Sequence, residues 1–91
     1  MWQIAKNIEA HVKKWENDAI VFVQGPDDTH LIDLYTASII NFLKLHPLTT
    51  EIDITNQLND EFGKTFQNDE VCAILSSLKS LKLVEEISEA R

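Results

Sequence analysis

The fold is decided by residues 19–33, which read AIVFVQGPDDTHLID. Residues 19–23 form a short apolar run, mostly β-branched and aromatic, with the length and composition of a buried strand. Gln24, Gly25, Pro26 and two aspartates follow, which are residue types that favour tight turns, and residues 29–32 then form a second strand-like run. This order predicts a β-hairpin whose loop is longer than two residues.

The residues before this hairpin add to the sheet. Residues 11–15 are a further candidate strand with weaker alternation, so that the sheet has two or three strands. Trp2 and Ile4 form either a short extra strand or pack against the core.

From Asp33 onward the apolar period changes from two residues to about 3.6, which predicts helices. Asp33 is suited to cap the first helix because its carboxylate can accept hydrogen bonds from free backbone N–H groups. Residues 46–49 contain Pro47 and predict a break before a second helix, which starts at Thr50 and ends at Gly63. We expect a third helix to be capped by Asn68.

Each predicted helix has one apolar stripe, and the three stripes predict the core. The stripes consist of Tyr35, Ile39, Phe42 and Leu43 in the first helix, Ile54, Leu58 and Phe62 in the second, and Val71, Ile74, Leu75, Leu78 and Leu81 in the third. Residues 83–87 are either a short last strand or coil. The expected fold class is therefore α+β and winged-helix-like: an N-terminal antiparallel β-hairpin or three-stranded sheet followed by a three-helix bundle, in a single domain over residues 1–91.

Composition restricts the classes of protein to which the chain can belong. The net charge of −7 makes long-range attraction to a nucleic-acid backbone unfavourable. A single cysteine, Cys72, excludes an internal disulfide, and no apolar run has the length of a membrane helix. These features favour a cytoplasmic protein that binds neither nucleic acid nor membrane.

The hairpin and two later segments resemble the PqqD-like proteins. The resemblance is carried by residues 21–33 (VFVQGPDDTHLID), by the link HPLT at 46–49, and by LKSLKLV at 78–84. It spans residues 12–84, and Trp2 and Trp15 suit the branch that accompanies kinases related to HPr kinase. Lys82 departs from the family pattern, because glycine is common at that position.

This resemblance implies a non-catalytic peptide chaperone. Such proteins capture the leader part of a precursor peptide as an added strand and present the peptide to a modifying enzyme. Carried over to this chain, the peptide would pair with residues 29–32 beside the third helix. The implied binding residues are Thr29, His30, Leu31, Ile32, Leu75, Leu78 and Lys79.

Candidate catalytic and metal-binding residues are few. His30 lacks an evident nucleophile and is expected to fix the hairpin or line the groove. Cys72 is expected to be a small buried filler. His11, His30, His46 and Cys72 lack the short paired spacing of metal ligands, so we expect no enzyme activity, no metal and no cofactor. The aromatic residues are expected to belong to the core, namely Trp2, Trp15, Phe22, Phe42 and Phe62.

Two alternatives to peptide capture remain open. A winged helix could bind DNA through the third helix, although that helix carries Asp69, Glu70 and a single base, Lys79. The free strand could instead pair with a second copy of the chain, which would give a structural or weak homodimer in place of a monomer.

Overall fold

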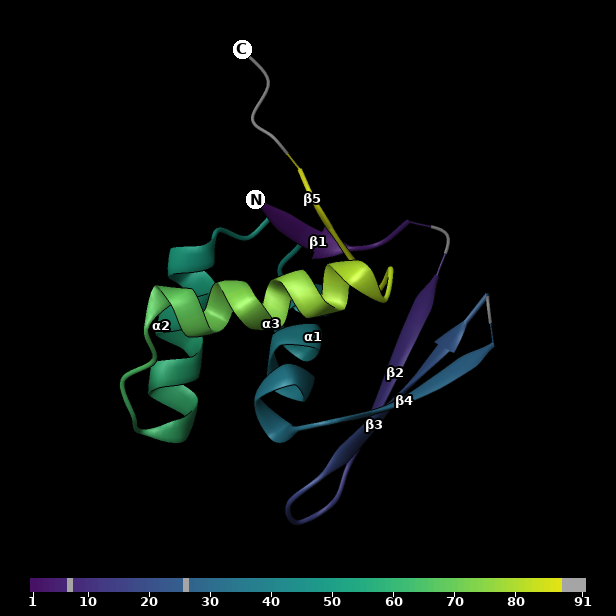
Figure 1. The fold of residues 1–91 in the computed structure, drawn as a ribbon, viewed down its shortest axis with the longest axis horizontal. Helices are drawn as coiled ribbons and strands as arrows, with labels where there is room; N and C mark the ends of the chain where they lie inside the picture. Colours follow the sequence, from purple (N-terminus) through teal and green to yellow (C-terminus); the bar gives the residue numbers. More distant parts are fainter. Residues whose placement is uncertain (7, 26, 88–91) are drawn as a thin grey trace.

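The computed structural model describes residues 1–6, 8–25 and 27–87 and has an α+β fold. Its elements are β1 (Trp2–Ile4), β2 (Glu9–Lys14), β3 (Ala19–Gln24), β4 (Asp28–Ile32), α1 (Leu34–Leu45), α2 (Glu51–Phe62), α3 (Asn68–Ser80) and β5 (Val84–Glu86). Figure 1 shows the sheet of β2, β3 and β4 on one side of the helices, with α3 running across them. The predicted order of an N-terminal antiparallel sheet followed by three helices is confirmed.

The main sheet is antiparallel, with the strand order β2-β3-β4. The β2–β3 turn covers residues 15–18 and is closed by a hydrogen bond of 2.7 Å from the Trp15 N–H to the Asp18 carbonyl oxygen. Between β3 and β4, Gly25 and Asp27 have positive φ angles of 124° and 59°, which explains the density of turn-forming residues there. Pro26, which belongs to the predicted turn, lies outside the described residues.

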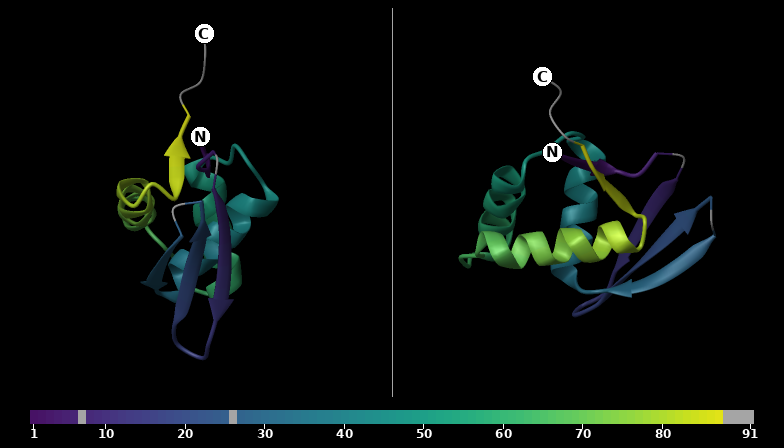
Figure 2. Two further views of the ribbon diagram at one scale, coloured as in Figure 1. Left: turned by 90° about the vertical axis from the view of Figure 1, so that its right-hand side faces the viewer. Right: turned by 45° about the horizontal axis from the view of Figure 1, so that its top comes forward.

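A second, two-stranded sheet joins the two ends of the described chain. β1 and β5 pair antiparallel, with Trp2 opposite Glu86 and Ile4 opposite Val84. Thr49 extends this pairing, because its N–H and carbonyl groups exchange hydrogen bonds with the backbone of Trp2. Trp2 and Ile4 therefore belong to a strand, and the residues after α3 form another. Figure 2 shows this small sheet above the helices and apart from the main sheet.

The helix caps follow the sequence signals with one correction. Asp33 caps α1 by accepting a hydrogen bond of 2.7 Å from the Thr36 N–H, and Thr50 caps α2. Gly63 ends α2 in the left-handed conformation. The prediction that Asn68 caps α3 is wrong: the cap is Gln67, whose N–H donates to the Glu70 carboxylate over 3.1 Å.

The end of α3 is a Schellman motif with a lysine at the position that usually holds glycine. The Leu83 N–H donates to the Leu78 carbonyl and the Lys82 N–H to the Lys79 carbonyl, both over 3.0 Å. Lys82 has a φ of 63°, in the left-handed region where a side chain is unfavourable. The buried pair Leu78 and Leu83 supplies the hydrophobic contact that accompanies the motif.

α1 occupies the centre of the core. It contacts β1, β2, β3 and α2, while α3 packs on α2 and β5. The buried core includes Trp2, Val21, Val23, Ile39, Ile40, Leu43, Ile54, Leu58, Val71, Leu75, Leu78, Leu83 and Val84. The described residues contain no helix that is both long and apolar enough to cross a membrane.

Two aromatic residues and one leucine that the sequence predicted to be in the core are exposed. Trp15 lies in the β2–β3 turn with 52% of its surface exposed, and Phe22 lies on the outer face of the sheet with 39% exposed. Leu81 caps α3 and is also exposed. The outer face is uncovered because all three helices pack elsewhere, whereas Phe42 and Phe62 are partly buried against the core.

Candidate functional site

The strand β4 forms one edge of the main sheet. It pairs with β3 on one side only, with Val21 opposite His30 and Ile20 opposite Leu31. On its other side, alternate residues present backbone N–H and carbonyl groups that no strand among the described residues pairs with. An edge of this kind can accept the backbone of a further strand.

A groove of about 310 Å³ lies between this edge and α3, and we call it the β4–α3 groove. The β4 side contributes Leu31 and Ile32, and the α3 side contributes Ile74, Ser77 and Leu78. Asp33, Thr36 and Leu81 complete its lining. The groove is mainly apolar, so it can accept an apolar side chain from a chain that pairs with β4.

A second cavity of about 510 Å³ lies at the other end of β4, and we call it the lysine pocket. Asp28 and His30 of β4 line it together with Lys82 and Lys6. Ile8, Val23, Leu81 and Leu83 supply its apolar wall. Leu81 lines both cavities, so the two follow one another along β4.

The structure brings together only part of the predicted binding set. Leu31, Ile32 and Leu78 line the β4–α3 groove, and His30 lines the lysine pocket. Thr29 is exposed on the outer face of β4 and lines neither cavity.

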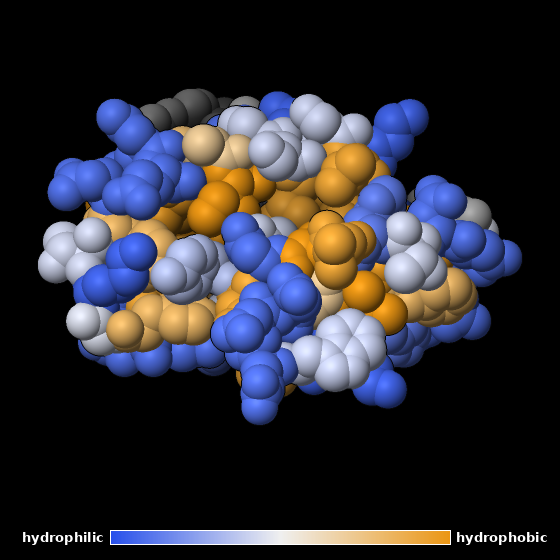
Figure 3. Space-filling model, turned by 60° about the horizontal axis from the view of Figure 1, so that its bottom comes forward, coloured by the Kyte–Doolittle hydropathy of each residue, from blue (hydrophilic) through white to orange (hydrophobic). Residues whose placement is uncertain are grey.

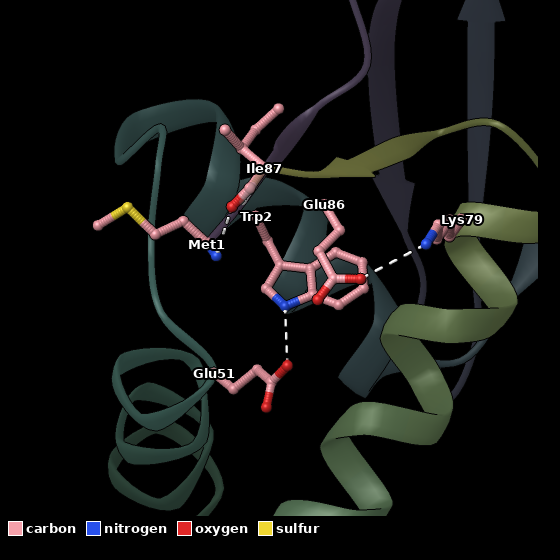
Figure 4. Close-up of polar contacts among 6 residues, drawn as sticks. All are labelled: Met1, Trp2, Glu51, Lys79, Glu86 and Ile87. Atoms are coloured by element: carbon pink, nitrogen blue, oxygen red, sulfur yellow. Dashed lines mark hydrogen bonds and ion pairs between the residues drawn. The ribbon is translucent and has the colours of Figure 1, made fainter. Parts of the chain in front are cut away.

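The other two members lie elsewhere. Leu75 has no exposed surface and belongs to the core, so it can support the groove only from beneath. The Lys79 ammonium lies 3.4 Å from the Glu86 carboxylate, on the side of α3 that faces β5 (Figure 4).

Several residues of the two cavities were not predicted as binding residues. Ser77 and Thr36 are small polar residues that helical periodicity does not distinguish from ordinary surface residues. Lys6 and Ile8 come from the N-terminal segment, whose position beside β4 depends on the β1–β5 pairing. Lys82 did carry a signal, because the PqqD-like pattern that the sequence resembles often has glycine at this position.

The opposite edge of the main sheet, β2, borders a cavity of its own. This cavity has a volume of about 550 Å³ and is lined by Gln3, Ile4, Lys6, Ile8, Glu9, Ala10, His11, Leu43, Lys44 and Pro47. β2 alternates charged residues with apolar ones, and its Lys14 reaches the Glu61 carboxylate of α2 over 3.8 Å. Charged side chains along an edge strand disfavour pairing with a further strand.

Cys72 belongs to a polar cluster between α2 and α3, away from both cavities. Its thiol donates to one carboxylate oxygen of Glu51 over 3.2 Å, and the Trp2 indole N–H donates to the other over 3.2 Å (Figure 4 shows the Trp2 contact). The hydrogen bond to Glu51, together with partial burial and the negative charge of Glu51, raises the pKa of the Cys72 thiol above its ordinary value. Cys72 is thus half-buried and hydrogen-bonded, not the expected apolar filler, and its thiolate is disfavoured.

One face of the molecule mixes hydrophobic and hydrophilic surface. Figure 3 shows hydrophobic surface lying between hydrophilic side chains on the face that comes forward from the bottom of Figure 1. Within residues 1–6, 8–25 and 27–87, no three His, Cys, Asp or Glu side chains gather in a group that could hold a metal ion. Comparisons with protein-family models, with curated proteins and with solved structures found no match to this chain.

Proposed function

We propose that this domain binds an extended peptide by adding it as a strand to the free edge of β4. The observation that supports this proposal is the position of the β4–α3 groove directly beside an unpaired strand edge. The resemblance to PqqD-like proteins suggests the peptide: the leader part of a precursor that a partner enzyme modifies. A cytoplasmic location and a non-catalytic role are parts of the same proposal.

The free edge can supply affinity without demanding a particular sequence. Each residue of an added strand that faces β4 exchanges backbone hydrogen bonds with it. Since these groups lie at a surface and exchange water for protein partners, each bond contributes about 1 kcal/mol. A few such bonds suit a module that must later release its peptide.

The β4–α3 groove can determine which peptide sequences bind. Leu31 is 76% exposed and adds apolar surface to the free strand, which a bound peptide would cover. Ile74 and Ile32 are partly buried at the core boundary and continue this apolar surface into the groove. Because Leu31 and Ile32 point to opposite faces of β4, successive residues of the added strand would cover them, one on the outer face and one in the groove.

The DNA-binding alternative has less support. α3 begins with Asp69 and Glu70, which a DNA backbone would repel, and the charge of its Lys79 is paired with Glu86.

A titration of the isotope-labelled domain with leader peptides encoded beside its gene tests the proposal. We expect the amide resonances of β4 and of the groove side of α3 to shift, and those of β2 and α2 to stay in place. Shifts confined to α2, or to the β2 cavity, would contradict the proposed site.

Two serines of α3 give a matched pair of variants. Ser77 lines the groove, and Ser76 is exposed but lies on the next face of the helix. Ser77→Trp should fill the groove and weaken peptide binding about tenfold or more, since it displaces an anchor side chain. Ser76→Trp should leave the affinity within about twofold. Equal losses in both variants would contradict the groove assignment.

Pairing between two copies through β4 is the competing use of the same edge. Sedimentation over a range of concentrations distinguishes the two uses, because peptide binding keeps the domain monomeric. A dimer that peptide does not dissociate, and that Leu31→Lys does dissociate, would favour the structural role over peptide capture.

A further inference from the structure

The two cavities along β4 differ in the charge of their walls. The β4–α3 groove has one charged group, Asp33, whereas the lysine pocket holds Lys6 and Lys82 together with Asp28 and His30. Within the described part of the chain, neither ammonium group forms an ion pair. The protein has a net charge of −7, so two lysines without an ion-pair partner beside a free strand edge form a locally positive region in an acidic protein.

The backbone at Lys82 supports a role for its side chain. Lys82 has a left-handed φ of 63° at the end of α3, a position where glycine would avoid the steric cost of a Cβ atom. Such positions cluster at functional sites, although Asp27 and Leu48 of this chain also have positive φ angles. Here the strained residue lies on the wall of the lysine pocket.

The geometry of a strand relates the two cavities to each other. Ile32 lines the groove, while His30 and Asp28, two and four residues away, line the lysine pocket. Side chains that point to one face of a strand recur at every second residue. A strand added to β4 would therefore place residues of even separation, about 7 or 14 Å apart, into the two cavities.

We infer that the captured peptide carries an apolar residue for the groove and an acidic residue two or four positions away for the lysine pocket. This inference rests on the proposed function and specifies its substrate. The acidic side chain would bind between the ammonium groups of Lys6 and Lys82. The carboxylate of Asp28 would repel an acidic side chain, so we expect the preference to be moderate. Replacing Asp28 tests this repulsion.

The experiment is a selection from a displayed library of random decapeptides, with the immobilised domain as bait. The Ser77→Trp domain, whose groove is blocked, gives the background. We expect the enriched peptides to pair an apolar residue with Asp or Glu at a separation of two or four residues. Separations of one and three are the internal control, because they send the second side chain to the opposite face.

Charge-reversal variants then assign the preference to particular residues. For an enriched peptide, the acidic form should bind about three- to tenfold more tightly than its lysine counterpart. Lys6→Glu with Lys82→Glu should reverse this order. Lys44→Glu, which changes a lysine outside the lysine pocket, should preserve it. Asp28→Asn should strengthen the acidic preference.

The possible outcomes separate this inference from the proposed function. Enrichment of apolar residues without a charge preference, or with acidic residues at odd separations, would overturn the inference and leave strand capture standing. A charge preference that survives the Lys6 and Lys82 reversals would overturn it as well. Enrichment no greater than with the Ser77→Trp domain would overturn strand capture and the inference together.

Discussion

The two edge strands of the main sheet, β2 and β4, differ in the charge of their side chains. Both edges have backbone groups without a strand partner among the described residues. β2 carries Glu9, Lys13 and Lys14, whereas β4 has a single charged residue, Asp28, at its start. The most exposed apolar side chain on either strand is Leu31 of β4.

This difference in charge is what the proposed function would require of the two edges. A charged edge such as β2 disfavours pairing with other chains, in the manner of strands that resist aggregation. The β4 edge instead lies beside α3, and the β4–α3 groove separates the two. Under the proposed function, the β2 edge would resist unspecific pairing and the β4 edge would accept a peptide.

The largest expected effect comes from the floor of the β4–α3 groove. Leu78 lines the groove with only 2% of its surface exposed, and Leu31 lines it from the exposed strand. Leu78→Ala should lower the free energy of unfolding by about 2–4 kcal/mol because it leaves a cavity in the core. Leu31→Ala should change it by less than about 0.5 kcal/mol and weaken peptide binding instead. Urea denaturation of both variants checks the contrast, which equal destabilisation would contradict.

A smaller effect is expected at the lysine pocket. Lys82→Gly should raise the free energy of unfolding by about 1 kcal/mol, since glycine adopts the left-handed conformation without steric cost. The same variant should bind acidic peptides more weakly. Lys44→Gly, in the last turn of α1, is the control and should be destabilising by about 1 kcal/mol. If Lys82→Gly instead lowered the free energy of unfolding, the contacts of the lysine side chain would contribute more to stability than its strained backbone costs.

Adding charge to the β4 edge should weaken its binding to a further strand, and removing charge from the β2 edge should strengthen such binding there. Leu31→Lys should lower the peptide affinity of β4 about fivefold while leaving the fold stable, because it gives this edge the character of β2. Replacing Glu9 and Lys13 by threonine should open the β2 edge and cause weak self-association, which light scattering measures. If the β2 double variant stayed monomeric at all concentrations, charge would not be what closes that edge.

The smallest effect concerns Cys72, on the side of α3 away from the groove. Because the hydrogen bond to Glu51 raises the pKa of the thiol, Glu51→Gln should speed its alkylation at pH 8, whereas peptide in the groove should leave the rate unchanged. Because of the raised pKa, the Cys72 thiol stays protonated to a higher pH in the folded state than in the unfolded chain. Stability should therefore fall as the pH rises above the ordinary pKa of a thiol and be unaffected below it. Peptide protection of the thiol would place the peptide on the wrong side of α3.

Local sequence signals determined most of the fold. The change of apolar period at Asp33 predicted the switch from strands to helices, and the caps at Asp33, Thr50 and Gly63 form as expected. These features depend on neighbours within one turn of the chain, so the sequence alone contains them. The strand at residues 29–32 was likewise predicted from its pattern after the turn, whereas its place at the edge of the sheet was implied only by the family resemblance.

The tertiary structure alone decided which side chains line the site. Leu75 and Leu78 share one helical stripe, yet only Leu78 reaches the groove, because the crossing of α3 over the core determines which part of the stripe meets β4. Lys6 comes to the lysine pocket through the β1–β5 pairing, which joins segments about eighty residues apart. Contacts of this range depend on packing between elements, and no local pattern of residues encodes them.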